Sequence, residues 1–513
     1  MRGDRVIVIG SGIGGLAAAL DLSSQGVNVT VLEKADYPGG KLHQLKAGGA
    51  LIDAGPTVFT MRWVFDELFA RAGASLADHI RMEPATRLAR HGWQDGAQLD
   101  LFSDIDRTAE AIAHMSGTRD AAGFRAFSAE ARRIYETLEA PFILSERPSL
   151  PGLIARVAAR TPANLWCIQP YASLWRKLGR HFRDPRLRQL FARYSTYCGS
   201  SPFRCPATLM LIAHVERQGV WLVEGGMQKI ADAAAALAVS RGCEIRYGTA
   251  VEEIGVSGGR ARSVRLENGE WIEADAIICN GDVNAVATGE FGQAPAKAAT
   301  PIPSARRSLS AMTWAMKATA SGFPLIRHNV FFCENYGQEF RDIFRKGQMP
   351  RAPTIYVCAQ DRGDRDAPRE LAAERLFCVM NAPAIGDSKQ FGEKEIEQCA
   401  ASMRETLRAC GLRIEAQPEA AVVTTPAQFH QRFPATGGAL YGRASHGWTA
   451  SFQRASARSR IPGLYFAGGS AHPGAGLPMA ALSGSLAAHS VATDLVLQKK
   501  CHRVAMPGGM STA

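Results

Sequence analysis

The chain has 513 residues, more than a single hydrophobic core usually organises, so we expect two or three domains. With 46% hydrophobic and 21% charged residues, its composition is that of a globular protein and excludes an intrinsically disordered chain. Its formal net charge is +11, and its 11 cysteines include no Cys-x-x-Cys pair, which argues against a disulfide framework or a metal site and is typical of a reduced cytoplasmic protein.

Residues 5–41 have the pattern of a dinucleotide-binding unit. The run Val6–Ile9 is typical of a buried parallel strand, and a glycine-rich turn, a helix over 16–25 and a second strand over 27–32 follow it. The glycines allow a tight turn and bring backbone N–H groups, at the positive end of a helix dipole, to a pyrophosphate. Glu33 ends the second strand, where a carboxylate holds ribose hydroxyls. The residues expected to bind the dinucleotide here are Gly10, Gly12, Ile13, Gly14, Gly15, Glu33 and Lys34.

The next residues indicate which dinucleotide is bound. An acidic side chain at the ribose position disfavours a 2′-phosphate, which leaves NAD or FAD. The sequence Pro38-Gly39-Gly40-Lys41 favours FAD, because two glycines and a cation suit a loop folded back over the pyrophosphate. The alternative is an ordinary loop with a solvated lysine. If FAD is bound, we expect Gly40 and Lys41 to contact it.

A strand-to-turn element follows at Leu51–Thr57, and residues 62–140 carry a mostly helical pattern. Residues 141–190 then hold nine Arg or Lys residues against two acidic ones, interleaved with Trp166, Trp175 and several leucines. That combination is typical of a membrane-surface segment that inserts apolar side chains and attracts anionic headgroups. The alternative is a helical domain with a solvated basic face. Nucleic-acid binding is disfavoured, because no recognition module accompanies the charge.

The rest of the chain alternates strands and helices. Between 207 and 290 we expect helices over 207–217 and 227–241 and strands over 243–247, 250–256, 262–267, 271–273 and 276–279. From 305 to 425, β-like runs and one helix over 393–409 predict an antiparallel sheet. Gly463–Gly469 is then typical of a strand entering a turn, and Ser470–Pro478 leads into a helix over 479–497 whose N-terminus presents free N–H groups.

If both ends of the chain touch one cofactor, they share one sheet, and the nucleotide-binding domain is discontinuous. The predicted fold class is α/β: a Rossmann-type FAD-binding domain with an inserted mixed-sheet substrate domain and a helical, membrane-facing segment. The expected parts are FAD-binding segments at 1–75, 221–290 and 431–498, a largely helical substrate and membrane-associating segment at 76–220, an antiparallel-sheet substrate domain at 291–430 and a disordered tail at 499–513.

Several motifs together resemble one family. GSGIGG with Glu33 and PGGK, DAGPT at 53–57, GGM at 225–227 and FAGGSAHPGAGLP at 466–478 are similar to the bacterial carotenoid desaturases of the phytoene desaturase type, in the wider FAD-dependent amine oxidase-like superfamily. The resemblance covers nearly the whole chain. Residues 57–69 most resemble the hydroxyneurosporene (methoxyneurosporene) desaturases, which introduce a 3,4 double bond into 1-hydroxy- or 1-methoxycarotenoids.

The resemblance implies an oxidoreductase that uses FAD to remove two hydrogens from a carotenoid, with a quinone or oxygen as electron acceptor. It implies further cofactor contacts from Gly55, Pro56, Thr57, Val251, Gly468, Gly469, Gly476 and Met479. It also implies a cytoplasmic protein that associates peripherally with the inner, photosynthetic membrane. In keeping with that location, no signal peptide precedes the strand at residue 5, and no run of about 18 uncharged apolar residues predicts a spanning helix.

Loss of a hydride and a proton also needs a base, for which Asp53 and His472 are candidates. For both we favour a structural role: a cap on the following turn for Asp53, and a hydrogen bond to the backbone before Pro473 for His472. Other hypotheses are a phytoene desaturase, an amine oxidase or protoporphyrinogen oxidase-like flavoenzyme, and a non-enzymatic, flavin-bound escort for pigment.

Overall fold

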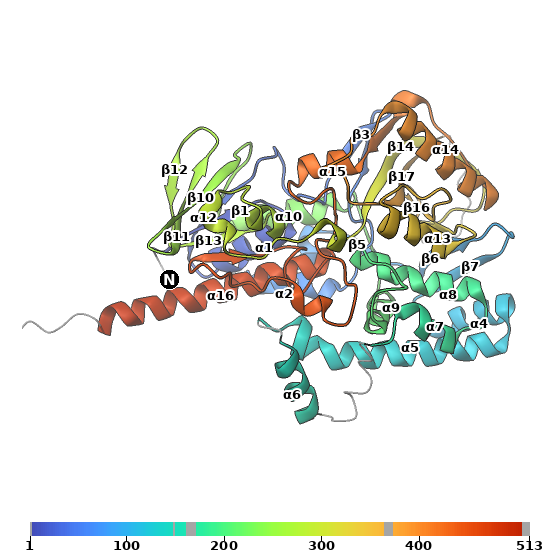
Figure 1. Ribbon diagram of the computed structural model, residues 1–513, viewed down its shortest axis with the longest axis horizontal. Helices are drawn as coiled ribbons and strands as arrows, with labels where there is room; N and C mark the ends of the chain where they lie inside the picture. The colour runs from blue at the N-terminus through green and yellow to red at the C-terminus, as the bar shows by residue number, and fades with distance from the viewer. Residues whose placement is uncertain (1–2, 147–148, 161–170, 364–372, 505–513) are drawn as a thin grey trace, which may run out of the picture.

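The computed structural model describes residues 3–146, 149–160, 171–363 and 373–504. The chain forms three groups of elements (Figure 1): a parallel sheet with its helices, a larger sheet at the opposite end, and a set of helices beside the larger sheet. Trp166, which belongs to the predicted membrane-facing segment, lies outside the described residues.

The parallel sheet has five strands in the order β20–β13–β1–β2–β9, and every pairing is parallel. The strands come from distant parts of the sequence: β1 (Arg5–Ile9), β2 (Asn28–Leu32), β9 (Glu244–Arg246), β13 (Ala276–Cys279) and β20 (Leu464–Phe466). Because the carboxyl ends of parallel strands lie along one edge, the turns that follow β1, β13 and β20 meet there.

A layer of other elements covers each face of this sheet. Successive side chains of β1 point to opposite faces and pack into the two layers in turn. Val6 and Val8 belong to an apolar cluster with helices α1 (Ile13–Ser23), α10 (Gln228–Ser240) and α16 (Leu477–Val504). Ile7 and Ile9 belong to a second cluster on the other face, formed with the antiparallel strands β10 (Val251–Ser257), β11 (Arg260–Leu266) and β12 (Trp271–Glu273). A strand buried on both faces needs a continuous apolar run, which Val6–Ile9 supplies.

Helices α1 and α16 pack closely and join the two ends of the chain (Figure 1). A Cβ atom on Gly484 would lie 2.0 Å from the carbonyl oxygen of Gly14, so only glycine permits this approach. Helix α16 continues to Val504, past residue 498, where the sequence predicts the start of a disordered tail. Within the described residues it is the one helix that is long and apolar enough to cross a membrane, and 44% of that stretch is buried inside the protein.

The second sheet has eight strands. They are β6 (Arg87–Gly92), β7 (Gln98–Phe102), β14 (Ser310–Gly322), β15 (His328–Phe331), β16 (Ile355–Ala359), β17 (Glu374–Ala382), β18 (Leu412–Glu415) and β19 (Ala421–Thr424). The strand order is β18–β14–β17–β16–β15–β6–β7, with β19 also on β14, and only the β15–β6 pairing is parallel.

Strands β6 and β7 correct the helical pattern expected over 62–140. Leu99 and Leu101 of β7 are buried while Gln98 is exposed, so this strand has the period-2 alternation of a half-buried sheet edge. The run is too short to outweigh the long amphipathic stretches around it. Strand β7 pairs with β6, and β6 pairs in turn with β15, which lies more than 200 residues further along the sequence, beyond the reach of a local pattern.

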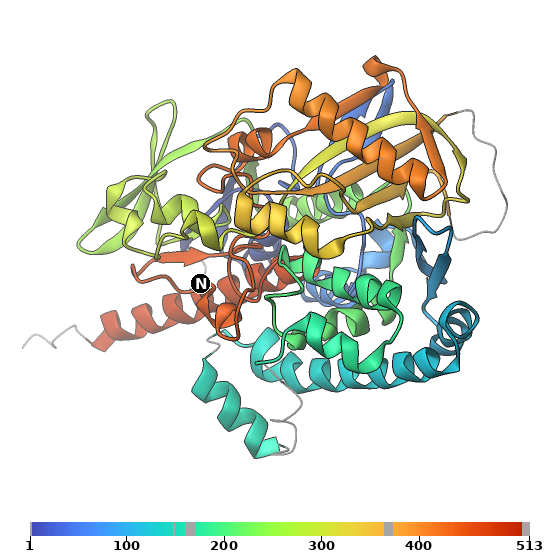
Figure 2. The same cartoon turned by 45° about the vertical axis from the view of Figure 1, so that its right-hand side comes forward.

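The helices beside this sheet are α4 (Ile105–Ser116), α5 (Thr118–Leu138), α6 (Leu150–Arg160), α7 (Leu174–His181), α8 (Pro185–Ala192) and α9 (Leu211–Arg217). Helix α6 projects from this group at the edge of the molecule, as Figure 2 shows. A short π-helix (Glu139–Ile143) continues α5 towards it.

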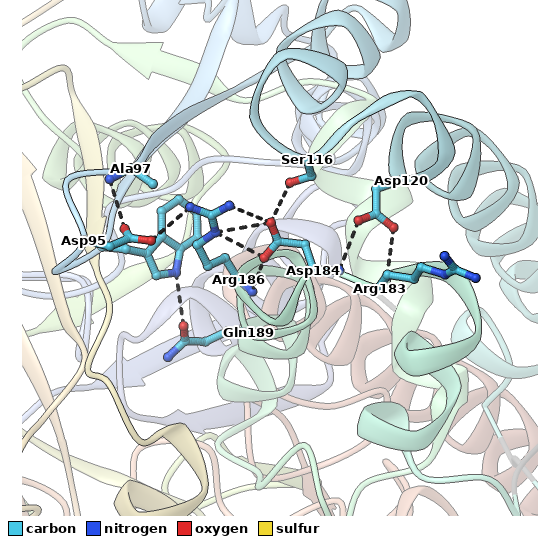
Figure 3. Close-up of polar contacts among 9 residues, drawn as sticks. Asp95, Ala97, Ser116, Asp120, Arg183, Asp184, Arg186 and Gln189 are labelled. Atoms are coloured by element: carbon cyan, nitrogen blue, oxygen red, sulfur yellow. Dashed lines mark hydrogen bonds and ion pairs between the residues drawn. The ribbon is translucent and has the colours of Figure 1, made fainter.

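Polar contacts at Asp184 join three of these helices (Figure 3). Asp184 caps α8 by accepting the N–H of Arg186 at 2.8 Å, pairs with the Arg186 guanidinium at 2.7 Å and accepts the Ser116 hydroxyl of α4 at 2.7 Å. Asp120 of α5 accepts the N–H groups of Arg183 and Asp184. These residues support the helical group, and none of them lines the cavity described below.

Further helices and strand pairs pack around these groups. They are the helices α2 (Arg62–Arg71), α3 (Leu76–His79), α11 (Val283–Ala287), α12 (Gln293–Ala296), α13 (Tyr336–Arg341), α14 (Glu393–Ala409) and α15 (Pro426–Arg432), and the strand pairs β3 (Gln44–Ala47) with β4 (Ala50–Asp53) and β5 (Met82–Pro84) with β8 (Trp221–Val223). The domain boundaries given above stay a prediction.

Candidate active site

One cavity of about 890 Å³ extends from the parallel sheet to the eight-stranded sheet. Its wall includes the turn after β1, the start of α16, strands β14 and β17 and helix α9. The predicted cofactor-binding residues that line it are Gly10, Gly12, Ile13, Gly14, Glu33, Lys34, Gly40, Lys41, Gly55, Pro56, Thr57, Val251, Gly468, Gly469, Gly476 and Met479. Gly15 alone of the predicted set does not line the cavity.

The turn after β1 forms a wall of bare backbone. Helix α1 begins at Ile13, and no side chain caps its N-terminus, so its first N–H groups are available to an anion. A Cβ atom on Gly14 would lie 2.8 Å from the backbone nitrogen of Gly468, which shows how closely the turns after β1 and β20 approach. Gly15 points into the turn, where a Cβ atom would lie 2.1 Å from the Gly10 carbonyl oxygen.

Glu33 lies at the edge of the cavity and is fixed by three donors. Its Oε2 accepts the N–H and the hydroxyl of Ser11 at 2.7 and 2.9 Å, and its Oε1 accepts the N–H of Ala35 at 2.8 Å. Because a carboxylate has about four acceptor positions, capacity remains for a ribose hydroxyl. The neighbouring Lys34 ammonium donates to the Arg432 carbonyl at 2.6 Å, and burial lowers the pKa of Lys34.

The loop at 38–41 packs directly on the turn at 53–57. A Cβ atom on Gly55 would lie 1.9 Å from the carbonyl oxygen of Lys41, so the two segments are in backbone contact. The Lys41 ammonium donates to the Leu440 carbonyl at 2.7 Å and lies 5.2 Å from the ring centroid of Phe433. Burial lowers the pKa of Lys41. These contacts are unlike those of a solvated loop lysine.

His472 and Asp53, the candidate bases, do not line the cavity. His472 is buried, its Nε2–H donates to the Phe142 carbonyl at 3.0 Å, and burial lowers the pKa of the imidazole to about 4. Asp53 accepts the N–H of Met227 at 2.8 Å and the Gln44 amide at 3.0 Å. Asp53 therefore caps the start of α10 and not the turn that follows it.

Several polar residues of the wall carry no sequence signal. They are Arg193, Tyr197, Glu216, Tyr336, Tyr356 and Arg454. Arg193 and Tyr197 share one short helix, and the other four come from separate segments, so only the tertiary structure brings the six together. Arg454 donates to the carbonyl oxygens of Gly469 and Tyr441, both at 3.0 Å, and so positions the turn that leads to α16.

The remaining wall is mainly apolar. It is contributed by the end of α5 and the π-helix, by α6, by residues 209–215 and by residues 448–452, and includes Leu138, Phe142, Ile143, Leu153, Leu209, Ile212, Val215, Trp448 and Phe452. We call this part the apolar compartment. Of the residues described, no group of three or more His, Cys, Asp or Glu side chains is arranged to hold a metal ion.

The nucleotide end of the cavity fits FAD in its chemistry. It combines uncapped N–H groups for a pyrophosphate, a fixed carboxylate for a ribose and glycines at the points of closest backbone approach. The second helix N-terminus, that of α16, adds further N–H groups and a positive dipole at the same cavity.

Comparison with known proteins identifies the family. Residues 13–492 match the family of flavin containing amine oxidoreductases. The chain is 53% identical to a hydroxyneurosporene desaturase of Rubrivivax gelatinosus, over 100% of this chain and 98% of that protein. It is 31% identical to a 1-hydroxycarotenoid 3,4-desaturase of Flavobacterium sp., over 94% and 98% of the two chains.

A solved structure with the same fold is the cyclohexylamine oxidase of Brevibacterium oxydans, with a TM-score of 0.56, 16% sequence identity and coverage of 96% of this chain and 99% of that one. This likeness confirms the α/β amine oxidase-like fold. The chain belongs to the flavin-containing amine oxidoreductases and, within them, to the carotenoid desaturases.

Proposed function

We propose that this protein is an FAD-dependent carotenoid desaturase that introduces the C3–C4 double bond into 1-hydroxy- or 1-methoxycarotenoids. The observation that carries the proposal is the single cavity, in which the glycine-lined dinucleotide wall continues into an apolar compartment. A long polyene suits such a compartment, because it asks for apolar contacts and few polar partners. The names of the Rubrivivax and Flavobacterium relatives favour this step over desaturation of phytoene.

The predicted FAD-binding residues would each contact a different part of the cofactor. The first turn of α1 would bind the pyrophosphate, Glu33 the ribose, and the Gly55–Thr57 turn with the first turn of α16 the flavin ring. When bound, FAD supplies the acceptor for the hydride that leaves the substrate. The apolar compartment would hold the polyene and keep water away from the reacting carbons.

The proton that leaves the substrate needs a route other than the two candidate bases. His472 and Asp53 lie outside the cavity, and both are engaged in hydrogen bonds to the fold. This geometry supports a structural role for each. The extended conjugation of the polyene itself stabilises the positive charge that develops when the hydride leaves.

We also propose that the substrate enters from a lipid surface beside α6. Four apolar residues in this part of the protein are exposed: Leu144, Ile154, Tyr171 and Trp448, which we call the apolar rim. The rings of Tyr171 and Trp448 are 5.5 Å apart, and Trp448 also lines the cavity. Exposed apolar side chains at a cavity entrance suit insertion into a bilayer.

The cations of residues 141–190 contribute unequally to such a surface. Lys177 is buried in an ion pair with Glu130 at 2.7 Å, and Trp175 packs on Phe203 with ring centroids 4.8 Å apart. These two residues therefore support the fold. Exposed cations remain for anionic headgroups at Arg156, Arg176 and Arg180. A quinone dissolved in the same bilayer is the electron acceptor that this location favours.

Expression in cells that make neurosporene or its 1-hydroxy derivative tests the function. We expect pigment extracts to contain a product that has lost two hydrogens at C3–C4, detected by its longer-wavelength absorption and its mass. Cells that carry the empty vector serve as the control. If the FAD-containing protein forms no such product, and no polyene bleaches its flavin absorbance without oxygen, the desaturase proposal fails and the escort hypothesis gains support.

A further inference from the structure

A polar cluster interrupts the cavity wall where the Gly55–Thr57 turn meets the eight-stranded sheet. Thr57 Oγ1 and the Tyr356 hydroxyl are 2.6 Å apart, and the same hydroxyl lies 2.7 Å from His328 Nδ1. The Arg193 guanidinium lies over the rings of Tyr356 and Tyr197, at 5.5 and 5.4 Å from their centroids. A cation thus lies against two aromatic rings on the wall of a largely apolar cavity.

Arg193 forms no ion pair with a carboxylate anywhere in the described residues. The nearby carboxylate, Glu216, already accepts the hydroxyls of Tyr194 and Tyr197. Burial opposes the charge of Arg193, but Tyr197 and Glu216 favour it, and the net effect raises the pKa of the guanidinium. The side chain therefore carries its charge at the cavity surface, where it hydrogen-bonds to the neutral side chain of Tyr197 and not to a carboxylate.

Tyr336 supplies an unpartnered hydroxyl in the same wall. It is 4% exposed, lines the cavity, and its hydroxyl has no hydrogen-bond partner in the described residues. Its electrostatic interaction with Arg193 shows that the two groups are neighbours. Buried polar groups are normally paired, so an unpartnered hydroxyl beside a guanidinium without a carboxylate partner indicates a ligand that carries a polar atom.

We propose that Arg193 recognises the oxygen on C1 of a 1-hydroxy- or 1-methoxycarotenoid and is the specificity-determining residue of the desaturase. This inference rests on the proposed function. A guanidinium has donors only, so it can bond to a hydroxyl or an ether oxygen equally, whereas a hydrocarbon end group offers it no acceptor. Both substituted substrates would be accepted, and the unsubstituted one disfavoured.

The position of Arg193 also explains why the C3–C4 bond of the carotenoid would be the one desaturated. Tyr356 connects the Arg193 guanidinium to Thr57, and Thr57 belongs to the turn proposed to contact the flavin ring. The C3–C4 bond begins two bonds from C1. A contact to the C1 oxygen at this place would therefore hold C3 and C4 beside the flavin, with the rest of the polyene in the apolar compartment.

The free-energy penalty for binding a carotenoid without an oxygen on C1 determines the expected selectivity. An end group without oxygen would desolvate the guanidinium without giving it an acceptor, and sites built for a hydrogen bond reject analogues that lack the partner. Loss of a hydrogen bond to a charged donor changes kcat/KM by about 10- to 100-fold. A mere structural role for Arg193 would lower activity on both substrates alike.

The test compares 1-hydroxyneurosporene and neurosporene, each delivered in vesicles to the purified, FAD-containing protein. For Arg193→Met, we expect the preference for the hydroxylated substrate, measured as the ratio of the two kcat/KM values, to fall by about 10- to 100-fold. Arg193→Lys keeps a charged donor and should restore part of the preference. Arg183→Met is the matched control, because Arg183 is exposed and outside the cavity, and it should change nothing.

A binding measurement makes the result independent of turnover. The dissociation constant of 1-hydroxyneurosporene, followed by quenching of protein fluorescence, should rise in Arg193→Met, while that of neurosporene stays within about twofold. Bound flavin and the melting temperature verify that each variant is folded. If Arg193→Met loses FAD, the test instead compares the substrate preference of Arg193→Lys with that of the wild type. An unchanged preference in folded variants, or equal use of both substrates by the wild type, overturns the inference but leaves the desaturase function standing. No turnover of either substrate by the wild type is instead a failure of the proposed function.

Discussion

The dinucleotide side of the cavity consists of backbone and glycine, whereas the substrate side consists of large side chains. On the first side, Gly14 and Gly468 approach so closely that a single Cβ atom has no room. On the second side, Phe142, Leu153 and Ile212 fill the wall from three separate elements, and Arg193 adds the charge. The difference shows that one wall of the cavity is formed by close approach of the backbone, whereas the opposite wall is formed by side chains that converge from distant segments.

The largest effect is expected from a side chain added to the glycine wall. In Gly14→Ala, the new Cβ would lie 2.8 Å from backbone atoms of Gly468, and overpacking of this kind costs about 1–3 kcal/mol. We expect the purified variant to lose most of its FAD, measured as the ratio of flavin to protein absorbance. Gly392→Ala is the control, because its Cβ would meet open space and its φ is −76°. Full FAD content in Gly14→Ala would contradict the position of the cofactor wall.

A smaller effect is expected on the substrate side, at the apolar rim. The double variant Ile154→Asp with Tyr171→Ser removes side chains that are 46% and 78% exposed. Because a fully inserted apolar side chain contributes about 1.5–3 kcal/mol, sedimentation with anionic vesicles should weaken by about 10-fold or more while FAD content is unchanged.

The matched control for the rim is Val239→Asp with Trp271→Ser. These residues are also exposed, at 53% and 50%, but lie on α10 and β12, which are both separate from α6 (Figure 1). Equal loss of vesicle binding in both double variants would mean that charge or general hydrophobicity, and not the rim, determines membrane contact.

The smallest effect concerns His472, at the junction of the two sides. Its folded-state pKa of about 4 lies below the ordinary 6.5, so as the pH falls the unfolded chain takes up a proton first. His472 therefore contributes stability that is present above pH 6.5 and is lost as the pH falls from 6.5 towards 4. We expect His472→Gln to flatten the dependence of the unfolding free energy on pH in that window, measured by urea denaturation.

Desaturation should largely survive His472→Gln, since the imidazole does not line the cavity. The exposed histidine of α4 provides the control substitution His114→Gln, which should leave the slope as it is in the wild type. Loss of turnover in His472→Gln with normal FAD content would instead restore His472 as a candidate base.

The sequence predicts well the elements whose patterns are local. Strand β13 at Ala276–Cys279 and helix α14 at Glu393–Ala409 have the bounds expected from their apolar patterns. The glycine motif likewise predicts most of the dinucleotide wall, although spacing alone does not reveal that Gly15 faces the inside of the turn. Strands β6 and β7 were missed, because both are short and β6 joins the sheet by pairing with β15, far along the chain.

The substrate side could not be predicted for the same reason. Arg193 follows α8 in a stretch of ordinary amphipathic pattern, and nothing near it in the sequence distinguishes it from the other arginines around it. Its environment is made by Tyr197, four residues on, and by Tyr356 of β16. Only the folded chain separates a cation that faces a cavity from one that faces water.

The contact of α16 with α1 has a consequence for the order of events during synthesis. The unit β1–α1–β2 leaves the ribosome first, but its glycine turn is completed by Gly468, and its helix is covered by Gly484 and its neighbours. A nascent chain that lacks the last strand and helix thus has only half of its cofactor wall. We infer that FAD is captured at the end of translation, so a chain that stalls or is cut before α16 would be left empty and exposed to proteolysis.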